Sequence, residues 1–202
     1  MKYNPEIYSR RSIRLKGYDY SQAGAYFVTI CTQNQECLFG DITDGIMRAN
    51  HFGKIVGEQW NDIPQRFPVV QLDQFVVMPN HIHGVLVVVG APLAGAQLRA
   101  AARAAPTVGD IVGGYKSLSV HHCLHWIKQN VPQQRLGQLW QRNYWEHIIR
   151  DESELNSIRE YIRNNPAQWE MDKLYVDGQP NSPVPTEIRE PSTKYATEAW
   201  MV

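Results

Sequence analysis

Residues 75–88 read FVVMPNHIHGVLVV, two runs of β-branched and aromatic residues on either side of a Pro-Asn pair. Such runs favour β-strands, and Pro-Asn favours a turn. The pattern extends outward, so we expect strands at residues 69–78 and 81–89, joined as a hairpin. Because alternate residues of a strand point the same way, His81 and His83 share one face while Ile82 points into a core. The two imidazoles are then close enough to bind one cation.

Six further elements are expected from the hydrophobic periodicity outside this hairpin. They are strands at residues 25–34, 36–39 and 139–149 and helices at residues 52–67, 108–130 and 151–164. Strands and helices in this order predict an α+β fold, in which helices cover one face of a mainly antiparallel sheet.

The length of 202 residues predicts one domain, which we place at residues 1–169. Residues 91–106 are rich in Ala, Gly and Pro and are expected to form a surface insertion or linker, with a short Ala-rich helix as the alternative. Residues 170–202 are rich in proline and are expected to form a C-terminal tail.

Charge and cysteine content exclude several classes of protein. The chain has 20 Lys and Arg against 20 Asp and Glu, which rules out a histone-like polycation but permits a local basic groove. Three cysteines without a CxxC spacing argue against a disulfide framework or a thiolate zinc site. The first residues lack the apolar segment of a signal peptide, and the apolar run at residues 85–89 is far shorter than a membrane span. We therefore expect a cytoplasmic protein.

A His-x-His strand alone is weak evidence for a metal, because polar residues on a strand face are common. Amidohydrolase barrels, cupins and histidine-triad hydrolases all use such a strand, and none of them fits. The chain is too short for a barrel, no Glu and His follow on later strands as in a cupin, and Val85 stands where a third histidine would be needed.

Three blocks of the chain together resemble a fourth class, the HUH single-strand nucleases. The blocks are residues 10–34, 75–88 and 140–169. Their order is similar to that of single-tyrosine transposases of the insertion-sequence-200 type and of the REP-associated tyrosine transposases. The resemblance implies a ferredoxin-like antiparallel sheet with helices packed on it, the HUH nuclease core.

Residues 161–166 read YIRNNP and resemble the Y-I-x-x-N-P pattern around the nucleophile of this family. The resemblance implies that Tyr161 is the catalytic nucleophile and that Asn165 joins His81 and His83 as a ligand of Mg²⁺ or Mn²⁺. The helix alone favours a different interpretation, in which Tyr161 is a residue at the rim of the apolar stripe with its hydroxyl in water; the nucleophile assignment depends on the His-x-His strand and the motif together.

The implied activity is cleavage and rejoining of single-stranded DNA at hairpins formed by imperfect palindromes, through a 5′-phosphotyrosine intermediate. The protein would act as a monomer or homodimer. Candidate DNA-binding residues are Arg10, Arg11, Arg14, Lys16, Arg142 and His147. Two alternatives stay open: a relative that binds repeat hairpins without cutting them, and an unrelated metal hydrolase that would not require Tyr161.

Overall fold

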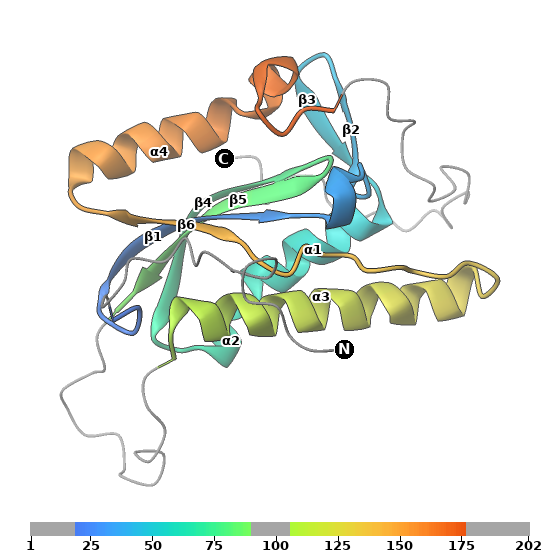
Figure 1. The fold of residues 1–202 in the computed structure, drawn as a ribbon, viewed down its shortest axis with the longest axis horizontal. Helices are drawn as coiled ribbons and strands as arrows, with labels where there is room; N and C mark the ends of the chain where they lie inside the picture. Colours follow the sequence, from blue (N-terminus) through green and yellow to red (C-terminus); the bar gives the residue numbers. More distant parts are fainter. Residues whose placement is uncertain (1–18, 90–105, 177–202) are drawn as a thin grey trace, which may run out of the picture.

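The computed structural model describes residues 19–89 and 106–176 (Figure 1). Its strands are β1 (Gly24–Cys31), β2 (Gly40–Thr43), β3 (Ile46–Ala49), β4 (Val70–Met78), β5 (His81–Val88) and β6 (Trp145–Ile149). Its α-helices are α1 (His51–Asn61), α2 (Ile63–Arg66), α3 (Val108–Asn130) and α4 (Glu152–Asn164). Two short 3₁₀ helices, η1 (Gln33–Gln35) and η2 (Pro166–Met171), complete the described chain.

Four strands form one antiparallel sheet in the order β4-β5-β1-β6. Helix α1 connects β1 to β4, and helix α3 connects β5 to β6. The chain therefore follows the βαββαβ path of a ferredoxin-like fold, and the expected α+β class is confirmed. Strands β2 and β3 form a separate hairpin.

Helices lie on both faces of the sheet, whereas the sequence predicted that they cover one (Figure 1). The main core lies between the sheet and helices α1 and α3, and it includes Ile82 and Leu86 of β5. A smaller core lies under α4 and contains Val85, Ile149 and Ile162. Strand β5 is buried on both sides, so both faces of the sheet need cover at this strand.

Three predicted elements need correction. Residues 36–39 form no strand; the chain there leads into the β2–β3 hairpin, whose turn contains Asp44 and Gly45 at positive φ. The helix expected at residues 52–67 divides at Asp62, because Pro64 lacks the N–H that would continue α1. The strand expected at residues 139–149 is confined to β6, and Trp140 instead forms an isolated bridge with Thr32.

The structure describes little of the two segments, residues 91–106 and 170–202, that we expected as an insertion and a C-terminal tail. The Ala-rich segment lies outside the described residues except for Pro106. The boundary expected after Trp169 falls inside η2, and the described chain continues beyond it to Val176. None of the described helices has the length and apolar character of a membrane span.

Candidate functional site

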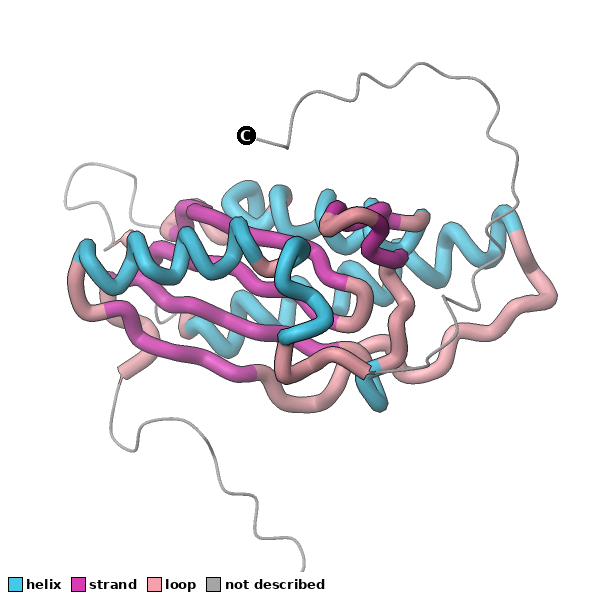
Figure 2. Tube along the Cα trace, turned by 90° about the horizontal axis from the view of Figure 1, so that it is seen from above, coloured by secondary structure: helices cyan, strands magenta, loops and turns pink. Residues whose placement is uncertain are grey.

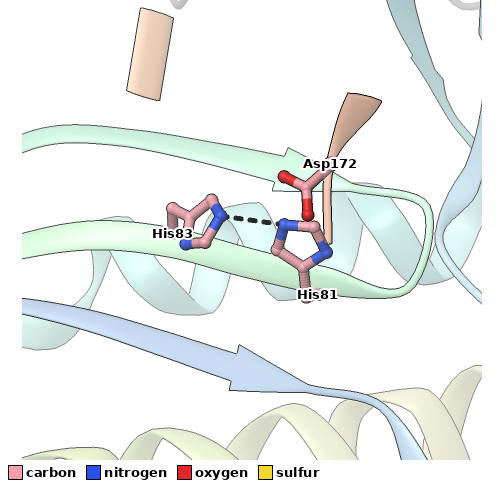
Figure 3. Close-up of side chains that lie close together, drawn as sticks. All are labelled: His81, His83 and Asp172. Atoms are coloured by element: carbon pink, nitrogen blue, oxygen red, sulfur yellow. Dashed lines mark hydrogen bonds between the residues drawn. The ribbon is translucent and has the colours of Figure 1, made fainter. Parts of the chain in front are cut away.

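His81 and His83 lie together at the start of β5, on the face of the sheet that carries α4. Both side chains are buried, and their Nε2 atoms are 3.0 Å apart (Figure 3). Two ligands of one metal ion bound at about 2.0–2.1 Å have a similar separation. The strand geometry expected from the sequence therefore produces a converging pair of imidazoles.

Asn80 fixes the proton of His81. Its Nδ2 donates to the carbonyl oxygens of Gln35 at 3.1 Å and Leu174 at 2.8 Å, so its Oδ1 is left to face Nδ1 of His81 at 2.8 Å. An amide oxygen only accepts, and His81 must therefore carry its proton on Nδ1. The Nε2 lone pair then points toward His83, as in metal-binding histidines whose other nitrogen is held by a neighbouring group.

Thr29 and Phe27 of the neighbouring strand β1 orient His83. The Thr29 hydroxyl lies 2.8 Å from Nδ1 of His83. The ring of Phe27 stacks on His83 with centroids 5.3 Å apart and meets Tyr161 edge-on at 6.1 Å. The imidazole is thus held in one position from two sides.

Tyr161 of α4 reaches this histidine pair. Its hydroxyl lies 3.2 Å from Nε2 of His83 and donates to Oδ2 of Asp172 at 3.5 Å. The residue as a whole remains 43% exposed, so it lies at the surface of the protein. Helix α4 is docked by Ile162 in the small core and by a paired contact of Arg159 with Asp73 at 2.7 and 2.8 Å. A rigid helix therefore presents the phenol at the rim of the site.

Asp172 is the third group of the site. One ligand atom each from His81, His83 and Asp172 lies within 4.8 Å of the others, so the three side chains form a group that could hold a metal ion. The carboxylate is positioned by the backbone N–H of Leu174 at 2.7 Å and by Nδ2 of Asn165 at 2.9 Å. The close-up shows the carboxylate directed toward the His pair (Figure 3).

Asn165, expected as the third ligand, lies beside Asp172. Its side chain is buried, and within the part of the chain that the structure describes its Oδ1 accepts no hydrogen bond. A buried carbonyl oxygen without a partner is costly, and a cation is one group that would satisfy it. The donor set of two imidazole nitrogens, a carboxylate and an amide oxygen fits a divalent cation.

Burial sets the protonation of the site. It lowers the pKa of His83 to about 4 despite the opposing effect of Asp172, and it lowers that of His81 well below the ordinary value with a further contribution from His83. Burial and the Asp172 carboxylate raise the pKa of Tyr161 to about 12. At neutral pH the site thus holds two neutral imidazoles and a protonated phenol beside one carboxylate.

The other expected site residues lie elsewhere. Arg142 is exposed in the segment before β6, and His147 of β6 lies 2.6 Å from Glu154 of α4. Arg10, Arg11, Arg14 and Lys16 lie outside the described residues. The sequence interpretation missed Asp172, which it assigned to the tail, and the supporting roles of Asn80 and Thr29. Asn80 was interpreted only as a turn residue, and no motif surrounds Asp172.

Comparisons with known proteins give similarities both in sequence and in structure. No family model matches the chain. An uncharacterised protein from Haemophilus influenzae strain Rd is 44% identical over 184 residues, which cover 87% of this chain and 98% of that protein. The solved structure of a REP-associated tyrosine transposase bound to a REP hairpin aligns with a TM-score of 0.51 and 17% identity, covering 80% of this chain and 77% of that one.

A second solved structure, of a transposase-like protein from Deinococcus radiodurans R1, has a TM-score of 0.43 and 17% identity over 76% of this chain and 97% of that one. That score is too low to establish a common fold. The described chain does share the fold of the hairpin-bound transposase.

Proposed function

We propose that this chain, which belongs to one family with the Haemophilus influenzae protein and has the fold of the REP-associated tyrosine transposase, is a metal-dependent single-stranded DNA transposase. It would cleave and rejoin DNA at hairpin sequences, with Tyr161 as nucleophile. The observation that carries the proposal is the 3.2 Å approach of the Tyr161 hydroxyl to a buried histidine pair. This approach places a nucleophilic group beside the residues that could hold a metal ion.

In the proposed reaction, the Tyr161 oxygen attacks the scissile phosphorus and the 3′ oxygen of the preceding nucleotide leaves as a hydroxyl. The product is a 5′-phosphotyrosine, which conserves the energy of the phosphodiester, so a later 3′-hydroxyl can attack it and restore Tyr161. Mg²⁺ or Mn²⁺ held by His81, His83, Asp172 and Asn165 would supply Lewis-acid stabilisation of charge on the phosphate.

We assign the removal of the Tyr161 proton and the orientation of its oxygen to the side chains that contact this hydroxyl. A pKa of about 12 means that Tyr161 is protonated at neutral pH and must lose its proton as it attacks. Asp172 accepts a hydrogen bond from this hydroxyl and is therefore placed to receive the proton. His83, kept neutral by burial, contacts the same oxygen and completes its orientation.

The decisive experiment replaces Tyr161 with Phe, which removes one oxygen from a half-exposed ring and leaves its packing intact. Incubation with Mg²⁺ and a labelled single-stranded hairpin oligonucleotide from the DNA flanking the gene should give a covalent protein–DNA band on a denaturing gel. Wild type should form this band and Tyr161→Phe should form none, although both shift the hairpin equally in a native gel.

Tyr144→Phe is the matched control, because Tyr144 lies in the segment before β6 and packs against the main core. It should form the adduct as wild type does. Adduct formation by Tyr161→Phe would remove Tyr161 as the nucleophile. Tight hairpin binding by wild type without any adduct would favour the relative that binds repeat hairpins without cutting them.

A further inference from the structure

Trp145 stands apart from the other tryptophans of the described chain. Trp60, Trp140 and Trp169 are buried, and Trp126 stacks on His51 with ring centroids 4.7 Å apart. Trp145 is 62% exposed, and within the described residues its indole makes no hydrogen bond and contacts no other ring. Core packing explains the other four side chains and does not explain this one.

The position of Trp145 connects it to the catalytic site. In the sheet, Thr29 of β1 is paired with His83 on one side and with Trp145 on the other. Side chains directly opposite one another in an antiparallel pair project from the same face. Neighbouring strands are about 4.8 Å apart, so Trp145 lies roughly 10 Å from His83 in the same cross-strand row.

The face that carries Trp145 is left open by the helix above it. Helix α4 packs mainly against β4 and contacts the edge strand β6 only toward its end, at His147 and Ile149, so the start of β6 is left open (Figure 2). Two residues farther along β6, His147 is already engaged by Glu154 of α4. Trp145 therefore presents an exposed aromatic ring between the site and the edge of the sheet formed by β6.

The segment that leads into Trp145 is held in place. The Lys116 ammonium of α3 donates to the carbonyl oxygens of Gln141 at 2.9 Å, Arg142 at 3.4 Å and Asn143 at 2.9 Å. The backbone N–H of Gln141 also donates to the carbonyl of Cys31 at the end of β1. These contacts place the indole on a rigid strand, and rigidity lowers the entropic cost of binding a planar group.

We infer that Trp145 is a stacking platform for an unpaired base of the single-stranded DNA, close to the scissile phosphate. The inference rests on the proposed function, because the site would bind the DNA phosphate next to this base. An exposed indole suits any base, since every base presents a π-face. The neighbouring exposed Arg142 adds the positive charge that a phosphate backbone requires.

A fluorescent thymidine oligonucleotide with one central 2-aminopurine tests the inference, because stacking on an indole quenches 2-aminopurine. Wild type should quench the probe, and Trp145→Ala should bind it about 5- to 100-fold more weakly without quenching. Trp145→Phe, which keeps an aromatic face, should recover most of the affinity, whereas Trp145→Leu should not. Leu124→Ala, which removes an exposed apolar side chain from α3 in the opposite layer, should behave as wild type.

The hairpin adduct assay separates this inference from the proposed function. Adduct formation by wild type together with equal probe binding by Trp145→Ala would overturn the platform and leave the transposase proposal standing. If wild type forms no adduct and binds no single strand, both fall. A wild-type dimer that becomes monomeric in Trp145→Ala, with unchanged DNA binding, would assign β6 to self-association and also overturn the platform.

Discussion

Asp172 supplies the negative charge of the candidate site, and it shifts the pKa values of both His83 and Tyr161. It opposes the fall in the pKa of His83 and contributes to the rise in the pKa of Tyr161. The Asp172 carboxylate also lies close enough to both histidines to offset part of the charge of a cation bound between them. A single carboxylate thus lies between the histidine pair and Tyr161, the proposed nucleophile.

Asp172→Asn should reduce Mn²⁺ affinity about tenfold or more, because the substitution preserves the shape of the side chain and removes its charge. His81→Ala and His83→Ala should abolish binding. Titration calorimetry measures the affinity, and the rise in melting temperature on adding Mn²⁺ gives an independent measure. Glu170→Gln, an equal charge change at an exposed neighbour, serves as control. Unchanged affinity in Asp172→Asn would exclude this carboxylate from the ligand set.

The histidine pair should make the stability of the metal-free protein depend on pH. Burial depresses the pKa of His83 from 6.5 to about 4, so below pH 6.5 the unfolded chain binds a proton that the folded protein does not. The free energy of unfolding should therefore fall as the pH is lowered from 6.5 toward 4 and be unaffected by this group above 6.5. The slope is up to about 1.4 kcal/mol per pH unit for each such histidine.

Urea denaturation across this pH window measures the slope. His83→Asn should flatten it by the contribution of one group. An identical slope in His83→Asn and wild type would contradict the buried neutral state of His83.

Strand β5 serves the core and the site on its two faces, and Gly84 shows how closely the core side is packed. A Cβ at Gly84 would lie 2.3 Å from Cζ2 of the Trp60 side chain, which passes across the strand. The absence of a side chain at Gly84 thus allows the buried indole of α1 to lie directly behind the histidine pair.

Gly84→Ala should destabilise the fold by about 1–3 kcal/mol, because the added carbon would force the buried Trp60 ring to shift. Gly113→Ala, in the interior of α3 with nothing within 4 Å of the added carbon, should instead stabilise it by about 0.5–1 kcal/mol. Thermal and urea unfolding of the two variants measure both effects. If Gly113→Ala lost as much stability as Gly84→Ala, the loss would come from replacing glycine with alanine and not from the contact with Trp60.

The elements that the sequence predicted well are those defined by short-range patterns. The β4–β5 hairpin follows from two β-branched runs around Pro79-Asn80, and α4 follows from its apolar stripe and the Asp151 cap. Asp172 could not be found in this way, because Pro166 ends the helix without indicating where the chain then runs. Only the turn through η2 returns Asp172 to the histidines, and that path depends on tertiary contacts such as Asn80 to Leu174.

At the scale of the whole molecule, the equal numbers of basic and acidic residues mean that the proposed DNA binding would have to depend on local clusters of positive charge. The densest cluster in the sequence, Arg10, Arg11 and Arg14 with Lys16, lies outside the described residues. Its role in DNA binding is therefore a proposal that rests on charge density alone, and salt dependence is the property that tests it directly.

Replacing Arg10, Arg11 and Arg14 with Gln should weaken binding to the hairpin oligonucleotide and reduce the slope of log affinity against log salt. Each phosphate contact on a single strand contributes about 0.7 to that slope, so losing three contacts should lower it by about 2. The control replaces Lys54, Arg66 and Lys128 with Gln, which changes the net charge equally on exposed positions of α1, α2 and α3, the layer opposite α4. Because counterion release depends on contacts and not on net charge, the control should keep the wild-type slope. Equal slopes in all three proteins would mean that the N-terminal arginines do not touch the phosphates, and the DNA path would then have to be sought on the open face between Tyr161 and Trp145.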